Sequence, residues 1–186
     1  FIYQGQEIGM TNTQFSGPDD FNDVFAKNTF RIKKAEGKSE AEITAELSPL
    51  SRDNARTPMQ WNSSAQAGFT TGKPWLKVNP NFPSVNVEAQ RKDPRSIFQF
   101  YRQLISLRKS DPVWVYGAFE LVEPEHEKIF AYTRTHGTEQ RLVVANLTGK
   151  PTLFPLPPGA ELLLGNYETL ANEFRPFESR VYRCKL

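Results

Sequence analysis

The sequence predicts an α+β chain in which a short strand, a long connecting region and one clear helix precede an antiparallel β domain. A helix is expected at residues 94–109, because Asp93 can serve as its N-cap and Pro94 suits the first helical position. Its apolar face would consist of Ile97, Tyr101, Leu104 and Ile105. After Pro112, strand-like segments follow one another with no helix between them, which is typical of an antiparallel β-sandwich.

The predicted strands of the β domain are short and are separated by turn-forming residues. Pro124, Gly137 and Gly149 are examples of the prolines and glycines that punctuate this region. The expected strands span residues 117–122, 129–133, 141–146, 152–156, 161–164 and 180–184. We therefore expect the β domain to occupy residues 113–186.

The start of the chain has the pattern of a strand that leads into a loop. Phe1, Ile2 and Tyr3 form an apolar run, and Gly5 and Gly9 follow it, where glycine permits unusual backbone angles. The chain does not begin with Met, and it lacks the basic and then apolar layout of a signal peptide. We therefore expect the chain to open in mid-structure, as part of a longer protein.

Residues 10–92 form a long connecting region, and its first helix candidate follows two acidic residues. Asp19 and Asp20 are suited to cap a helix that begins near them. The mostly apolar face of that helix would consist of Phe21, Val24, Phe25, Asn28 and Ile32.

The second helix candidate of the connecting region begins at Ser39. Ser39 and Glu42 match a capping box, and the helix must end before Pro49. Beyond it, prolines and glycines rule out long regular elements over residues 51–87. We expect this stretch to be an ordered loop, because Trp61 and other aromatic residues can pack it.

The composition excludes several classes of partner. The 23 Lys and Arg residues nearly balance the 21 Asp and Glu residues, so nothing points to nucleic acid as a partner.

Cys184 is the one cysteine and cannot form an internal disulfide. No apolar run approaches the roughly 20 residues of a membrane span, and His126 and His136 lack metal-ligand spacing. We expect a soluble, cytoplasmic protein with no membrane partner, metal or cofactor.

The segment from Ser51 to Trp61 combines two arginines, an acid, amides and a Trp in one irregular stretch. Arg52 and Arg56 could clamp a carboxylate or donate to sugar hydroxyls through the fork of the guanidinium group. Alternatively, both arginines could pair with acids elsewhere and fix the loop. The residues alone leave both interpretations open.

Several motifs together resemble one enzyme family. The first ten residues, FIYQGQEIGM, are similar to the last barrel strand and the following turn of enzymes of the α-amylase superfamily (glycoside hydrolase family 13). Residues 52–61 (RDNARTPMQW), 67–75 (AGFTTGKPW) and 78–81 (VNPN) resemble oligo-1,6-glucosidases and their relatives, which include dextran glucosidases, sucrose isomerases and trehalose synthases. The similarity continues through the helix at 96–108 and covers most of the chain.

The resemblance implies a (β/α)8 barrel whose last strand is residues 1–4 and whose last helix is residues 94–109. Residues 1–112 would then be the end of the catalytic barrel, with a long insertion between the last strand and the last helix. Residues 113–186 would be the C-terminal domain. Active sites of such barrels lie at the C-terminal ends of the strands, where residues 4–9 emerge.

The resemblance also implies roles for individual residues. An arginine at the position of Arg52 contacts the glucose at the nonreducing end in the relatives, so Arg52 is the candidate substrate-binding residue. Asp53, Arg56 and Glu7 are expected to shape the loops near the site. The family's nucleophile, acid/base and third carboxylate follow earlier barrel strands, so no catalytic residue is expected in this chain.

The implied parent protein is a retaining α-glucosidase that hydrolyses α-glucosidic bonds at the nonreducing ends of short oligosaccharides, with α-1,6 bonds expected first. The chain would be inactive without its partner, the N-terminal part of the barrel. A sucrose isomerase or trehalose synthase is the alternative within the family. Another class is a structural or carbohydrate-binding β module, for which the structural role is favoured because the strand aromatics fit core packing as readily as stacking on sugars. These are Phe119, Phe130, Tyr132, Phe154 and Tyr182.

Overall fold

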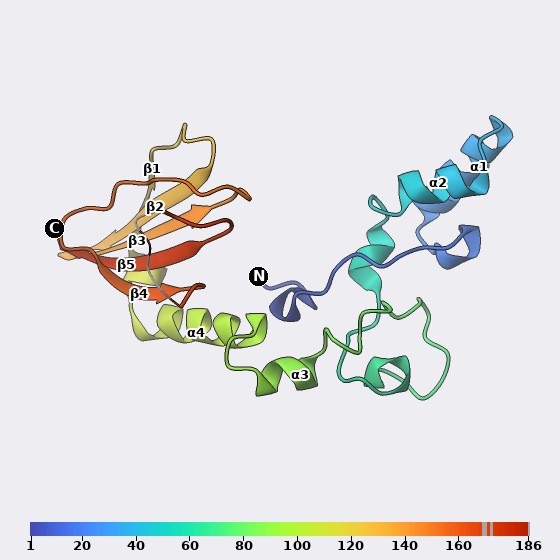
Figure 1. Cartoon of the computed structure of the whole chain (residues 1–186), viewed down its shortest axis with the longest axis horizontal. Helices are drawn as coiled ribbons and strands as arrows, with labels where there is room; N and C mark the ends of the chain where they lie inside the picture. The colour runs from blue at the N-terminus through green and yellow to red at the C-terminus, as the bar shows by residue number, and fades with distance from the viewer. Residues whose placement is uncertain (169–170, 172, 186) are drawn as a thin grey trace. The chain divides into compact units, whose positions relative to one another are not determined.

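The computed structural model describes residues 1–168, 171 and 173–185, and its contacts divide the chain into two units, residues 1–101 and 102–186. The division falls within helix α4 (Ile97–Ser110). Figure 1 shows the helices and loops of the first unit and the sheet of the second. In the described part of the chain, no helix combines the length and the apolar character needed to cross a bilayer.

The second unit is built on a five-stranded antiparallel sheet with the order β1-β2-β3-β5-β4. Its strands are β1 (Ala118–Val122), β2 (Ile129–His136), β3 (Glu139–Asn146), β4 (Glu161–Gly165) and β5 (Ser179–Lys185). The expected antiparallel β domain is confirmed. The segment 152–156, expected as a strand, contributes only an isolated bridge between Thr152 and Phe174, because nearby prolines cannot donate to a ladder.

One face of the sheet encloses the apolar core of this unit. Leu142 in β3 lies opposite Tyr182 in β5, and both side chains are buried. Phe154 and Phe174 come from connecting segments and meet edge to face, with ring centroids 6.3 Å apart. The core consists of Ile129, Ala131, Leu142, Val144, Phe154, Phe174, Tyr182 and Cys184. Connecting segments therefore cover this face of the sheet.

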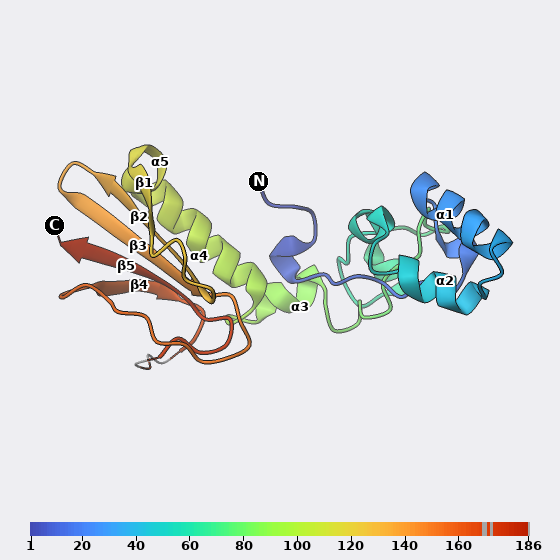
Figure 2. The ribbon, with the colours of Figure 1, turned by 90° about the horizontal axis from the view of Figure 1, so that it is seen from above.

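The opposite face of the sheet packs against the C-terminal half of α4 and against the short helix α5 (Val113–Tyr116), as Figure 2 shows. Arg108 in α4 donates a hydrogen bond of 2.9 Å to the carbonyl of Trp114 in α5. A small hollow of about 220 Å³ remains there, lined by Leu104, Leu107, Arg108, Trp114, Tyr132, Val143 and Val181. Leu104 and Leu107 thus face the sheet, whereas Ile97 and Ile105 of the expected apolar face are exposed.

A buried ion pair joins two residues at the start of β5. Glu178 and Arg180 are 1% and 2% exposed, and the Arg180 Nε lies 2.7 Å from a Glu178 carboxylate oxygen. The guanidinium also donates to the carbonyls of Ala171 and Glu173 and lies over the ring of Phe174. Burial by itself raises the pKa of the Glu178 carboxyl, but the Arg180 side chain and a backbone N–H outweigh it and lower that pKa overall.

The first unit consists of short helices joined by ordered loops (Figure 1). Its elements are η1 (Gln6–Ile8), η2 (Pro18–Asp20), α1 (Val24–Ala35), α2 (Glu40–Leu47), η3 (Arg52–Arg56), η4 (Ala65–Gly68), α3 (Val87–Lys92) and the first residues of α4. Residues 1–3, expected as a strand, are not part of one, because no described segment offers them a hydrogen-bonding neighbour.

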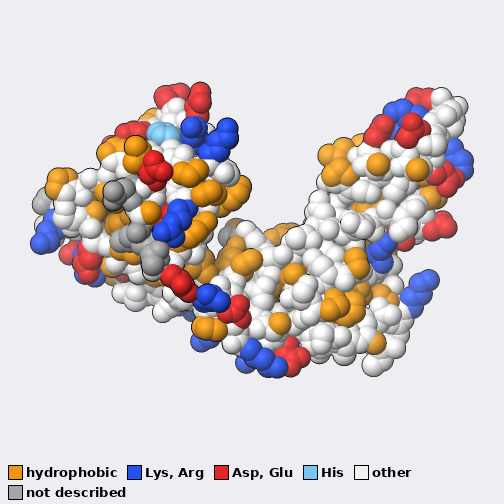
Figure 3. All heavy atoms as spheres, viewed as in Figure 1, with side chains coloured by type: hydrophobic (Ala, Val, Ile, Leu, Met, Phe, Trp, Pro, Cys, Tyr) orange, Lys and Arg blue, Asp and Glu red, His pale blue; other side chains and the backbone are white. Residues whose placement is uncertain are grey.

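Helices α1 and α2 form a hairpin with its own apolar core. That core is made of Phe15, Phe21, Ala26, Phe30, Ile43 and Leu47. The capping box expected at the start of α2 is confirmed, with Ser39 and Glu42 each bonding the other's backbone N–H. Lys33 of α1 forms an ion pair with Glu46 of α2, and Lys38 in the connecting loop pairs with the same carboxylate at 2.6 Å. Figure 3 shows charged side chains of both signs over this hairpin.

Helix α1 begins later than expected and buries a different face from the one expected. Asp19 and Asp20 lie in the turn η2, and Asp23 is the N-cap, accepting from the Phe25 N–H. Phe21 precedes the helix, as the C-cap residue of η2, so its burial does not mark the buried face of α1. Ala26 and Phe30 are buried, whereas four residues of the predicted face are exposed, namely Val24, Phe25, Asn28 and Ile32.

Helix α4 begins at Ile97 rather than at Pro94, because a helix that was not expected precedes it. Asn86 caps α3 by accepting from the Ala89 N–H. The N–H of Asp93 bonds back to the Ala89 carbonyl, so Asp93 ends α3 instead of opening the next helix.

The capping box provides a test of the hairpin. We expect Ser39→Ala to remove the acceptor for the Glu42 N–H and to destabilise α2 by about 1 kcal/mol. Amide hydrogen exchange of residues 40–47 should then become roughly fivefold faster. Ser39→Asp keeps an acceptor at the same place and should leave the exchange nearly unchanged. Equal exchange rates in the Ser39→Ala chain and in the unaltered chain would contradict this role of the cap.

The buried ion pair provides a test of the β unit. Arg180→Met leaves the Glu178 carboxylate buried without its partner, which should cost about 3–5 kcal/mol. Amide exchange of β3 and β5 measures this loss. The double change Glu178→Met with Arg180→Met should restore part of the stability, because no unpaired charge is then buried. A loss below about 1 kcal/mol in the single variant would show that water reaches the carboxylate.

The same pair predicts a dependence of stability on pH. Because folding lowers the pKa of Glu178 from its ordinary value of 4.5, the stabilisation is fully present above that value. It should be lost as the pH falls through the lower pKa of the folded state. The Glu178→Met, Arg180→Met double variant should lack this component when unfolding is followed against pH.

Candidate functional site

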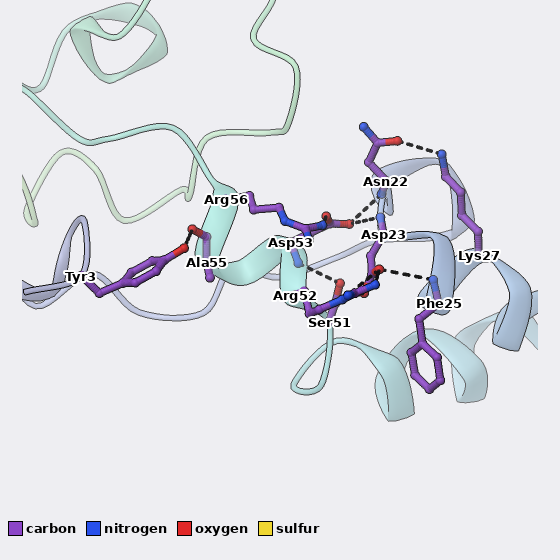
Figure 4. Close-up of polar contacts among 10 residues, drawn as sticks. All are labelled: Tyr3, Asn22, Asp23, Phe25, Lys27, Ser51, Arg52, Asp53, Ala55 and Arg56. Carbon is purple, nitrogen blue, oxygen red and sulfur yellow. Dashed lines mark hydrogen bonds and ion pairs between the residues drawn. The ribbon is translucent and has the colours of Figure 1, made fainter. Parts of the chain in front are cut away.

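The candidate site is the short 3-10 segment η3 and the loops that hold it in place (Figure 4). Ser51 precedes the segment and accepts a hydrogen bond of 3.2 Å from the Asp53 N–H. Asn54 donates to the Ser48 carbonyl at 2.7 Å and accepts from the Thr13 N–H at 3.1 Å. These bonds fix η3 to the end of α2 and to the loop that follows η1.

Asp53 is fully buried, at 0% exposure, and hydrogen bonds compensate for the burial of its charge. One carboxylate oxygen accepts the backbone N–H groups of Asn22 and Asp23, at 2.6 and 2.7 Å. The other accepts a bond of 3.2 Å from Arg56 Nη1. Asp53 therefore binds the turn before α1 to η3.

Arg52 forms a forked ion pair with Asp23, as the dashed lines of Figure 4 show. The Arg52 Nε lies 3.1 and 3.2 Å from the two carboxylate oxygens, and Nη2 bonds one of them as well. Asp23 is 1% exposed, whereas the side chain of Arg52 is 63% exposed. A buried carboxylate thus holds a guanidinium group that faces solvent.

The ion pair determines the protonation of Asp23. The hydrogen bond from Arg52 lowers the pKa of the Asp23 carboxyl and outweighs the opposing effect of burial. The pKa of Arg52 is raised by the same hydrogen bond. Asp23 therefore remains a carboxylate at neutral pH, and it cannot serve as the general acid of a glycosidase, which needs a raised pKa.

Tyr3 and Gln4, at the expected end of the barrel strand, lie beside η3. The Tyr3 hydroxyl donates to the Ala55 carbonyl at 2.9 Å. Two open hollows, of about 290 and 360 Å³, share Tyr3, Gln4, Ala55 and Thr57 among their lining residues. Phe69 and Trp75 line only the second hollow, and Arg52 lines neither of the two.

Both arginines of the motif pair with acids, and Glu7 lies apart from them. Arg56 bonds Asp53, its neighbour three residues earlier, and Arg52 bonds Asp23. Glu7 lies in η1, and no described hydrogen bond joins it to η3. The structure therefore brings Arg52, Asp53 and Arg56 together and leaves Glu7 outside this group.

Sequence reasoning missed the partner of Arg52. Asp23 had a detectable signal, because an Asp before an amphipathic stretch is a good N-cap. The expected cap was placed at Asp19 and Asp20, so Asp23 was counted as a residue inside the helix. The bonds from Asn22 and Asp23 to Asp53 had no signal, since they use backbone N–H groups.

The remaining motif residues stabilise the loop itself. Gln60 is fully buried, and its amide donates to Asn81 at 2.9 Å and to the Val85 carbonyl at 2.6 Å. Asn79 donates to the Thr11 carbonyl at 2.9 Å. Within the described residues, no group of three His, Cys, Asp or Glu side chains is placed to hold a metal ion.

Two family models match the chain in consecutive ranges. The model described as "Alpha amylase, catalytic domain" matches residues 1–117. The model described as "Maltogenic Amylase, C-terminal domain" matches residues 119–177.

Known proteins that resemble this chain are much longer than it is. The oligo-1,6-glucosidase of Parageobacillus thermoglucosidasius is 42% identical over the whole chain, and the trehalose-6-phosphate hydrolase of Bacillus subtilis (strain 168) is 40% identical over 98% of it. The chain spans 35% of the length of each.

Solved structures agree with the sequence comparison. The trehalose-6-phosphate hydrolase of Bacillus licheniformis matches the whole chain with a TM-score of 0.92 and 40% identity, over 36% of its own length. The trehalulose synthase of Pseudomonas mesoacidophila MX-45 matches 98% of the chain with a TM-score of 0.88 and 42% identity, over 35% of its own length. The resemblance drawn from the motifs is thus confirmed. The chain belongs to the α-amylase family, and it comprises the end of the family's barrel and the antiparallel β domain that follows.

Proposed function

We propose that this chain is the C-terminal part of a retaining α-glucosidase that releases glucose from the nonreducing ends of short oligosaccharides, with α-1,6 bonds as the first expectation. Several similar proteins are oligo-1,6-glucosidases, at 41–42% identity. They support this activity. The oligosaccharide substrate and the remainder of the barrel are then the partners of the chain.

The observation that carries the proposal is an exposed arginine held by a buried acid. Arg52 uses Nε and Nη2 to bind Asp23, and no described residue bonds its Nη1. The free N–H groups of a fixed guanidinium can donate to sugar hydroxyls. We therefore assign substrate binding to Arg52. Asp53 and Arg56 shape the segment that carries it, and Glu7 shapes the turn after the barrel strand.

The catalytic carboxylates belong, in this proposal, to the part of the enzyme outside these 186 residues. A retaining glycosidase needs a nucleophile and an acid about 5–5.5 Å apart. Asp23 is held as a carboxylate by Arg52, and Asp53 is fully buried with its oxygens engaged. Neither is suited to attack a sugar or to protonate a leaving group.

We assign the two parts of the chain to two domains of the enzyme. Residues 1–112 are the end of the catalytic barrel, and residues 113–186 are the C-terminal domain. We propose a structural role for the latter. Phe119, Phe130 and Tyr132 share one face of the sheet, but neighbouring rings are tilted by 34° and 52°, unlike a planar platform for sugars.

A second candidate within the family is an isomerase. The solved structure of a trehalulose synthase, 42% identical to this chain, supports it. Its identity to this chain equals that of the oligo-1,6-glucosidase of Parageobacillus thermoglucosidasius. Product analysis with sucrose distinguishes the candidates, because an isomerase returns a disaccharide and a hydrolase returns two monosaccharides.

Activity measurements test the proposed function. We expect the longer enzyme that contains this chain to release glucose from isomaltose and from p-nitrophenyl α-glucoside. The purified 186-residue chain, checked by mass for any associated fragment, should release none. Turnover by the chain alone would contradict the assignment of the carboxylates, and Glu7 and Asp53 would become the residues to exchange.

Substitution of Arg52 tests its role in binding. Arg52→Gln in the longer enzyme should lower kcat/KM roughly 10- to 150-fold, as expected for the loss of about 1.5–3 kcal/mol of hydrogen bonding to a charged donor. Arg31→Gln is the matched control, because Arg31 is an exposed arginine of α1 and no described ion pair involves it. Equal kcat/KM in both variants would refute the assignment.

A further inference from the structure

The orientation of Arg52 depends on one side chain that no motif includes. Arginine has many rotamers, and an exposed arginine without a partner samples several of them. Arg52 is exposed, yet its Nε and Nη2 both bind the carboxylate of Asp23. This fork determines the plane of the guanidinium and the direction in which Nη1 points.

Asp23 itself is fixed in three ways. Its backbone N–H donates to the buried carboxylate of Asp53 at 2.7 Å. Its side chain caps α1 by accepting from the Phe25 N–H at 3.2 Å. It is 1% exposed, so the surrounding atoms leave its carboxylate little freedom. A side chain held on both its backbone and its carboxylate can serve as a rigid anchor.

We propose that Asp23 is a positioning residue that holds the guanidinium of Arg52 in the orientation in which it binds the sugar. This rests on the proposed function, since it takes Arg52 as a substrate contact. Asp23 does not touch the substrate. It acts by removing the rotational freedom of Arg52 before the sugar arrives, so that binding does not have to restrict that side chain.

The neighbouring acid cannot take over this role. Asp53 already accepts two backbone N–H groups and Arg56, so its oxygens are occupied. The bond from Arg56 is a single contact of 3.2 Å and fixes no plane. Loss of the Asp23 charge therefore releases Arg52 rather than transferring it to another acid.

Asp23→Asn is the informative substitution, because asparagine caps helices as well as aspartate does. It keeps the shape and the cap and removes the charge that holds Arg52. In the longer enzyme we expect KM to rise, by roughly 30-fold at most, which corresponds to about 2 kcal/mol of arginine rotamer entropy. We expect kcat to change less than about threefold, since the catalytic carboxylates are not involved.

A double-substitution cycle separates positioning from a general structural role. If Asp23 acts through Arg52, Asp23→Asn should have almost no further effect in an Arg52→Gln background. An equal effect of Asp23→Asn in both backgrounds would overturn the proposal, and so would an unchanged KM in the single variant. Asp20→Asn is the matched control, because it removes an ion pair with Lys77 that does not involve Arg52.

A measurement without catalysis tests the same geometry in the 186-residue chain. The Arg52 Nε–H should give one slowly exchanging NMR signal, and Asp23→Asn should speed that exchange, whereas Asp20→Asn should not. Unchanged exchange in Asp23→Asn would overturn the positioning role. If NMR gives the expected result but Arg52→Gln leaves kcat/KM unaltered, the assignment of substrate binding to Arg52 fails and the positioning of the guanidinium stands.

Discussion

Asp53 places a negative charge where water does not reach it, and the local structure around η3 follows from the need to compensate for that burial. Two backbone N–H groups and one arginine converge on its oxygens. Because the N–H groups belong to the turn before α1, this turn must lie against η3. The start of α1, the position of Asp23 and finally the orientation of Arg52 depend on this arrangement.

Those elements of the fold that depend on local chemistry could be predicted from the sequence. The capping box at Ser39 and Glu42 uses residues three apart, and the structure forms it as expected. Five of the six segments expected as strands in the β domain form strands, and four of the five described strands extend beyond their expected ranges at one end or both. The chemistry that determines these elements lies within a few residues of each one.

The elements that were missed compete with equally good local alternatives. Asp19, Asp20 and Asp23 can each cap a helix, and only the bonds to Asp53 favour the last of them. In the same way, Asp93 has the features of an N-cap before Pro94, but it ends α3. A contact distant in sequence decided the first case, whereas a competing local cap, Asn86 at the start of α3, decided the second.

In the candidate site too, local features could be predicted from the sequence, whereas contacts distant in sequence could not. The motif led us to propose Arg52 as a substrate-binding residue, but the partner of Arg52 lies 29 residues earlier in the sequence. Asp53 was expected to shape the loop, whereas its bonds to backbone N–H groups have no residue signature at all. A motif therefore suggests a candidate binding residue more readily than it indicates what holds that side chain in place.

The α1–α2 hairpin packs around its own apolar residues, and it is connected to η3 through the bonds at Asn22 and Asp23 and through Asn54. Its outer surface, including Val24, Phe25 and Ile32, takes no part in that core. The packing of the hairpin core therefore places no constraint on these three side chains. Over evolutionary time, this surface can change in sequence while the bonds of Asp53 and Asp23 keep the Arg52 guanidinium in place.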